Sequence, residues 1–257
     1  MVTRGGTTMS HLPLSSFAAD PRMAQLAELL NRPRGFNLLS ALGLDRQELR
    51  HSALLAYLLD PRQPHGLGDR FARALLERVA PLLSETLDVP SLSLAGMTVQ
   101  REWGRIDILL ESSADQLAVI IENKVDSAEH SDQLGRYGRL MRERRPGWRL
   151  AGVYLTLDGV APAHEADCAL YAPLGYSDVA AALEELAGVP GAARDVPALL
   201  RHYALLIRSE LVPDQDSDQT RLARRLYMDH RPAAEAMLKA RDTRMTMVER
   251  HFEGLFN

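Results

Sequence analysis

The fold is decided by residues 99–137, which read VQREWGRIDILLESSADQLAVIIENKVDSAEHSDQLGRY. Two short apolar runs lie inside this stretch, at 106–110 and 117–121, and both are rich in β-branched residues. The polar tract 111–116 between them is typical of a turn. Short β-branched runs on either side of a turn predict a β-hairpin that is buried on at least one face.

Charged residues occur in this predicted hairpin where a core strand rarely carries them. Asp107 interrupts the first run, and the second run ends in Glu122-Asn123-Lys124. Because strand side chains alternate between faces, Glu122 and Lys124 point to one side and Asn123 points to the other. If the strands pair through the turn, Asp107 reaches the same patch. Two carboxylates and one ammonium would then converge at the end of an apolar hairpin.

Charge content alone leaves two interpretations of this patch open. Burying a charge is costly unless the group is paired or binds a metal. A structural ion pair of Lys124 with Glu122 or Asp107 is the simpler interpretation, and structural pairs of this kind are common. A functional site that binds a metal ion is the other.

The order Asp, strand and turn, then Glu-x-Lys resembles the motif of the PD-(D/E)XK nuclease superfamily. The flanking sequences GRIDIL at 104–109, IENKV at 121–125 and EHSDQLGRY at 129–137 are similar to one bacterial branch of that superfamily. The stretch 48–61 looks like the opening helix of the same branch. The chain departs from the motif at Ile106, which stands where the superfamily name has its proline.

The resemblance implies an α/β fold with a restriction-endonuclease-like core, in which helices flank a mixed central β-sheet. It also implies an Mg²⁺ site, for which Mn²⁺ can substitute, with Asp107, Glu122 and the backbone carbonyl of Asn123 as ligands. Oxygen ligands of this kind are those that Mg²⁺ prefers. The catalytic residues that the resemblance implies are Glu48, Asp107, Glu122, Lys124 and Gln133.

Each catalytic residue has an expected role. Lys124 would position the attacking water or stabilise developing charge, and Gln133 would orient the site or the phosphate. Glu48 would hold a water at the metal or a second ion. The simpler role for Glu48 is a capping box with Asp45 at the start of a helix over 45–59. The resemblance also makes His51 a candidate site residue, although a weaker one than Glu48.

Composition limits the class of protein. The 257 residues suffice for one sizeable core, and 46% apolar with 25% charged residues is typical of a soluble globular protein. The net charge of −4 does not indicate a nucleic-acid binder, so any basic surface must be local. Cys168 is the only cysteine, which excludes an internal disulfide and a thiolate metal cluster. Neither a signal peptide nor an apolar run of membrane-spanning length is recognisable, so we expect a cytoplasmic protein that does not enter a membrane.

The predicted organisation has three parts. We expect a flexible N-terminus at 1–20, a nuclease-like domain at 21–212 and a helical C-terminal extension at 213–257. The C-terminal helices would form a cap or a dimer contact, so a homodimer is one expectation. Within the domain, helices are predicted at 45–59, 67–83, 126–145, 176–186 and 192–211, with further strands at 148–157 and 168–171.

A run of arginines follows the hairpin. Five arginines fall between 136 and 145 on the predicted helix. Arg136, Arg139 and Arg142 lie off its buried stripe. A solvated helix face is the usual explanation of a charge run. A ridge that contacts phosphates beside the site is the alternative, and we give the two equal weight.

Together with the resemblance, these features predict an Mg²⁺-dependent nuclease that hydrolyses phosphodiester bonds in nucleic acid. DNA is favoured as the substrate and endonuclease action over exonuclease action. Nucleases of this fold often serve restriction, phage defence or repair, which is an analogy from fold. Three alternatives stay open: a nucleic-acid-binding module that cleaves poorly, a protein-interaction module, and an RNase on the same site.

Overall fold

The computed structural model describes residues 14–31, 35–125, 132–212 and 217–239. The chain divides into two compact units. The larger unit is Phe36–Pro213, and the smaller one combines Met1–Gly35 with Asp214–Asn257. All the predicted site residues lie in the larger unit.

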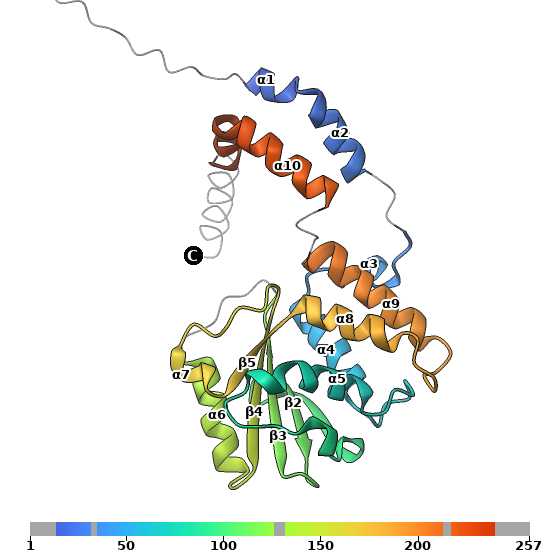
Figure 1. The fold of residues 1–257 in the computed structure, drawn as a ribbon, viewed down its shortest axis with the longest axis vertical. Coiled ribbons are helices and arrows are strands. Elements are labelled where there is room, and N and C mark those ends of the chain that lie inside the picture. The colour runs from blue at the N-terminus through green and yellow to red at the C-terminus, as the bar shows by residue number, and fades with distance from the viewer. Residues whose placement is uncertain (1–13, 32–34, 126–131, 213–216, 240–257) are drawn as a thin grey trace, which may run out of the picture. The chain divides into compact units, whose positions relative to one another are not determined.

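The larger unit is built on one five-stranded sheet with the strand order β1-β2-β3-β4-β5 (Figure 1). The pairs β1–β2 and β2–β3 are antiparallel, whereas β3–β4 and β4–β5 are parallel. The sheet is therefore mixed, as predicted. The strands are β1 Thr98–Trp103, β2 Ile106–Ser112, β3 Leu117–Asn123, β4 Arg149–Thr156 and β5 Tyr171–Gly175.

The predicted hairpin is formed by β2 and β3. Its register places Ile108 opposite Ile121 and Leu110 opposite Val119. A two-residue turn joins β1 to β2, and Gly104 has a φ of 61° in that turn. Such positive φ angles are typical of the tight turns that match the twist of a hairpin.

Helices cover both faces of the sheet, which confirms the predicted architecture. On one face, β2 and β3 residues such as Ile108 and Ile121 pack in one core with α4, α5, α8 and α9. On the other face, Ile120 packs with Leu134, Tyr137 and Met141 of α6. The helices of this unit are α3 Leu38–Ala41, α4 Glu48–Leu59, α5 Arg70–Val79, α6 Gln133–Arg144, α7 Glu165–Cys168, α8 Tyr176–Leu186 and α9 Val196–Leu206.

Several predicted boundaries were wrong. Helix α4 begins at Glu48 with Gln47 as its N-cap, so Asp45 is not the cap of this helix. The strand predicted at 168–171 begins instead at Tyr171, because the residues just before it form the short helix α7. The predicted helix 126–145 is observed from Gln133, and residues 126–131 lie outside the described part of the chain.

The described part of the smaller unit is helical, with α1 Leu14–Ala18, α2 Pro21–Leu30 and α10 Asp218–Asp229. Asp20 caps α2 by accepting from the Arg22 backbone N–H, and Arg22 pairs with Asp229 at 2.7 Å. These contacts tie α2 to α10. Helix α1 falls within the N-terminal segment expected to be flexible, and the three-part domain division stays a prediction.

Membrane insertion was not expected from the sequence. Within the described ranges, no helix has both the length and the apolar character that crossing a membrane requires.

Candidate active site

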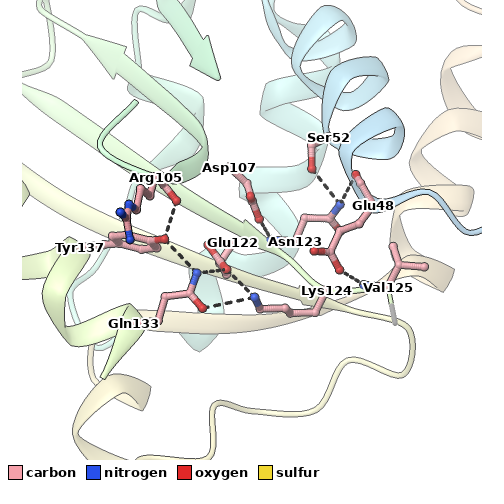
Figure 2. A network of polar contacts seen from close by, with 10 residues as sticks. All are labelled: Glu48, Ser52, Arg105, Asp107, Glu122, Asn123, Lys124, Val125, Gln133 and Tyr137. Atoms are coloured by element: carbon pink, nitrogen blue, oxygen red, sulfur yellow. Dashed lines mark hydrogen bonds and ion pairs between the residues drawn. The ribbon is translucent and has the colours of Figure 1, made fainter. Parts of the chain in front are cut away.

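The predicted charged residues meet where β3 ends (Figure 2). Extending the β2–β3 register by one residue beyond the Ile108–Ile121 pair places Asp107 opposite Glu122. Side chains of opposed residues lie on the same face of a sheet. That face is the one covered by α6, where Gln133 also lies.

The two carboxylate oxygens of Glu122 have different surroundings. Oε1 lies 2.8 Å from Lys124 Nζ and accepts a hydrogen bond of 2.7 Å from Gln133 Nε2. Oε2 is buried, and among the described residues it has no hydrogen-bond partner. The side chain of Glu122 is only 1% exposed. A buried, unpaired carboxylate oxygen carries an uncompensated desolvation cost. A bound cation or hydrogen-bond donor at this atom would offset that cost.

Asn123 brings Asp107 to the same edge. The Asn123 backbone N–H donates to Asp107 Oδ2 at 2.8 Å. The N–H and C=O of a strand residue point to the same neighbouring strand. The Asn123 carbonyl is therefore directed toward the side of β3 on which Asp107 lies.

Burial and mutual charge shift the pKa values of this cluster. Burial first, and then the negative charge of Asp107, raise the pKa of Glu122 to about 7. Burial also raises the pKa of Asp107, although the bond from the Asn123 N–H opposes this change. For Lys124, burial favours the neutral amine, but the nearby carboxylates outweigh it and raise its pKa. Lys124 is therefore an ammonium at neutral pH.

Gln133 connects the charged residues to a tyrosine. Its Oε1 accepts from Lys124 Nζ at 3.3 Å, and its Nε2 donates both to Glu122 and to the Tyr137 hydroxyl, the latter at 2.9 Å. The Tyr137 hydroxyl in turn donates to the backbone carbonyl of Arg105. Tyr137 was not among the site residues predicted from the sequence. Its position four residues after Gln133, on the same side of the helix, could have indicated this contact.

Glu48 reaches the site from α4 rather than capping that helix with Asp45. Its Oε2 accepts a hydrogen bond of 2.8 Å from the backbone N–H of Val125, directly after the Glu-Asn-Lys segment (Figure 2). The capping-box interpretation is therefore wrong. His51, one turn further along α4, is fully buried and contacts Tyr203 and the Asp45 carbonyl.

The three arginines singled out in the sequence are all exposed on α6. The guanidinium of Arg136 lies 5.6 Å from the centre of the Tyr137 ring. Arg139 pairs with Asp132 at 2.5 Å. Arg139 and Arg142 also line a hollow of about 490 Å³ between α6 and α7. Arg139 and Arg142 thus lie on the α7 side of α6, and none of Asp107, Glu122, Lys124 and Gln133 lines that hollow.

The available donors suit a hard divalent cation. No group of three or more His, Cys, Asp or Glu residues that could hold a metal is found in the described part of the chain. The predicted set does not need three, because it comprises two carboxylates and one carbonyl. The unpaired Oε2 belongs to Glu122, the residue opposite Asp107, and it is the kind of oxygen ligand that Mg²⁺ prefers. The residues present therefore fit such an ion.

Comparison with known proteins addresses the family directly. Searches of curated proteins and of solved structures gave no match. A family model described as the PD-(D/E)XK nuclease superfamily matches residues 36–220, which is more than half of the chain. That range includes Asp107, Glu122 and Lys124, and it confirms the resemblance noted from the motifs. The chain thus belongs to the PD-(D/E)XK nuclease superfamily.

Proposed function

We propose that the protein is an Mg²⁺-dependent endonuclease that hydrolyses phosphodiester bonds in DNA. The observation that carries this proposal is the buried Oε2 of Glu122, which lacks a partner while Oε1 is held by Lys124 and Gln133. A purely structural ion pair accounts for Oε1 but leaves Oε2 buried at a cost. A cation beside Asp107 would remove that cost.

Asp107, Glu122 and the Asn123 carbonyl are the residues that would hold the ion. A divalent cation bound there would polarise the phosphate and lower the pKa of an attacking water. The chain itself fixes the geometry. Gln133 and Lys124 both contact Oε1, so the orientation of the Glu122 carboxylate is preorganised in the absence of a ligand.

Lys124 is the chain's own source of positive charge at this point. Its ammonium is held between Glu122 and Gln133, at 2.8 Å and 3.3 Å, and is only 8% exposed. A fixed ammonium in a buried site stabilises negative charge that develops on the phosphate, and it can orient the attacking water. Gln133 would act by holding that ammonium in place. Glu48 would support the same segment through Val125.

Nucleic acid would approach along α6. Arg136, Arg139 and Arg142 are exposed on this helix, which starts at the site residue Gln133. Exposed arginines beside a cleavage site suit contacts to backbone phosphates, which position the substrate without reading its sequence. We further propose a cytoplasmic setting in restriction, phage defence or repair, on the analogy of the fold.

The test is incubation of the protein with circular DNA, linear DNA and RNA, each with Mg²⁺, with Mn²⁺ and with EDTA. Cleavage of circular DNA that needs the metal is the expected result. Cleavage of linear DNA alone would replace the endonuclease by an exonuclease, and cleavage of RNA alone would make the protein an RNase. Binding of DNA without any cleavage would contradict the proposal and favour a binding module.

A further inference from the structure

The side chain of Asn123 faces away from the charged cluster and is fully buried. Its Nδ2 donates to Ser52 Oγ at 3.0 Å and to the Glu48 carbonyl at 3.3 Å, as Figure 2 shows. Its Oδ1 accepts from the Tyr176 hydroxyl at 2.9 Å. The amide is thus held from two helices, α4 and α8, on the face of the sheet opposite the proposed site.

A buried polar chain continues from this amide and is formed by Asn123, Tyr176, Tyr203 and His51. The Tyr203 hydroxyl lies against that of Tyr176 and 3.0 Å from His51 Nδ1. His51 Nε2 donates to the Asp45 carbonyl at 3.0 Å, since a carbonyl can only accept. Each of these side chains is 0% exposed. This series of polar side chains therefore runs from α4 and α9 to β3, through the core that α4, α5, α8 and α9 form on this face of the sheet.

The end of β3 has few other anchors on its β2 side. The β2–β3 ladder stops at the Ile108–Ile121 pair, two residues before Asn123. Beyond that point, Asn123 is held on this side by the bond from its own N–H to Asp107. On the other side it stays paired with Leu155 of β4. The next two residues are held by their own backbone bonds, from Lys124 N–H to the Leu155 carbonyl and from Val125 N–H to Glu48 Oε2, both at 2.8 Å. The Asn123 amide adds a restraint that acts from the face of the sheet opposite the charged cluster.

We propose that Tyr176 is a positioning residue that fixes the Glu122–Lys124 segment through Asn123. Because neighbouring strand residues share one backbone, a turn at Asn123 moves Glu122 and Lys124 together on the opposite face. The Asn123 carbonyl, proposed above as a ligand, moves with them. Tyr203 packs against Tyr176, and the ring of His51 stacks on that of Tyr203. The consequence for cleavage rests on the proposed function, whereas the restraint on the backbone does not.

Packing alone does not require these hydroxyls. Tyr176 and Tyr203 sit among leucines, valines and alanines of the larger core, where phenylalanine would fill nearly the same space. Polar networks in a core are costly unless satisfied, and what they provide is a single defined arrangement. Groups one step behind a metal ligand commonly change metal affinity or activity by about 10- to 100-fold when removed.

The decisive variant is Tyr176→Phe, which removes one oxygen and keeps the ring. The control is Val179→Ala, which creates a small cavity in the same helix and core without touching the polar chain. Both are compared with the wild type in amide hydrogen exchange across 117–125, in calorimetric titration with Mn²⁺, and in kcat and KM for circular DNA. Asn123→Ala, alone and combined with Tyr176→Phe, completes a double-mutant cycle.

We expect Tyr176→Phe to speed exchange at 123–125 and to weaken Mn²⁺ affinity and kcat by about tenfold or more, with KM unchanged. Val179→Ala should leave all of these at the wild-type level, and Tyr176→Phe should add nothing once Asn123 is alanine. Wild-type exchange and Mn²⁺ affinity in Tyr176→Phe, or equal changes in Val179→Ala, would overturn the positioning role. If exchange responds as expected but the wild type neither binds Mn²⁺ nor cleaves, the positioning role stands and the proposed function fails.

Discussion

Binding of a divalent ion at Glu122 should displace a proton near neutral pH. Burial and the charge of Asp107 raise the pKa of Glu122 to about 7, whereas an ordinary glutamate titrates near 4.5. A carboxyl with a raised pKa holds its proton at pH values where it would normally be ionised. Since a metal ligand must be deprotonated, the proton competes with the ion below the raised pKa and ceases to compete above it. Metal affinity should therefore rise as the pH increases through 7.

The size of the effect follows from that pKa. A site that must lose one proton with a pKa of about 7 binds the ion about tenfold more weakly at pH 6 than at pH 8. Binding should release about one proton at pH 6 and about a tenth of a proton at pH 8. A glutamate with the ordinary pKa of 4.5 would give almost the same affinity at both pH values and release almost no protons.

Calorimetric titration with Mn²⁺, repeated in buffers of different ionisation enthalpy, measures both the affinity and the protons released. Asp107→Asn provides an independent check in the metal-free protein. It removes the neighbouring charge, so the midpoint of the Glu122 carboxyl in an NMR titration should move to lower pH. An affinity that is flat between pH 6 and pH 8, without proton release, would refute the reasoning about this site.

Three further predictions concern the surrounding residues. Lys124→Ala should keep or slightly raise Mn²⁺ affinity, since a charge that repels the ion is gone. The rate of cleavage should nevertheless fall by about a hundredfold to ten-thousandfold. Nicking at the wild-type rate would show that Lys124 takes no part in the reaction. Gln133→Ala removes one of the two contacts that hold the Lys124 ammonium and should lower kcat by about tenfold or more at unchanged thermal stability. A wild-type kcat would show that Gln133 has no role in the reaction. Replacing Arg136, Arg139 and Arg142 together by alanine should flatten the dependence of log K for DNA on log salt. An unchanged slope would show that this side of α6 is an ordinary solvated helix face.

The sequence was sufficient to predict the hairpin and the direction of its charged side chains. Short β-branched runs on both sides of a polar turn determined the strands, and the two-residue period placed Glu122 and Lys124 on one face. The structure has both features. These predictions succeeded because they depend on local pattern and on the register of adjacent strands.

Long-range partners could not be predicted in this way. Tyr176 lies 53 residues after Asn123, and no periodicity within either segment indicates that their side chains meet. The same limit explains the error at Glu48, where the local spacing from Asp45 fits a capping box. In the folded protein its carboxylate bonds instead to the N–H of Val125, 77 residues away.

The strand predicted at 168–171 failed for a different reason. A short run that is mostly apolar fits a strand or one turn of helix about equally well. Here the residues up to Cys168 form α7, and β5 starts at Tyr171, whose ring packs over Gly152 of β4. A side chain at position 152 would collide with that ring. The start of β5 is thus fixed by a packing contact that the local pattern does not contain.

The central claim is that Glu122 and Asp107 hold a divalent ion needed to hydrolyse a phosphodiester bond. Its most direct test is the nicking of supercoiled circular DNA by the wild type and by Glu122→Gln, which keeps the shape of the side chain and removes its charge. We predict that the wild type nicks the DNA with Mg²⁺ but not with EDTA. Folded Glu122→Gln should not nick the DNA under either condition. Equal nicking by the two proteins, or nicking by the wild type in EDTA, would contradict the claim.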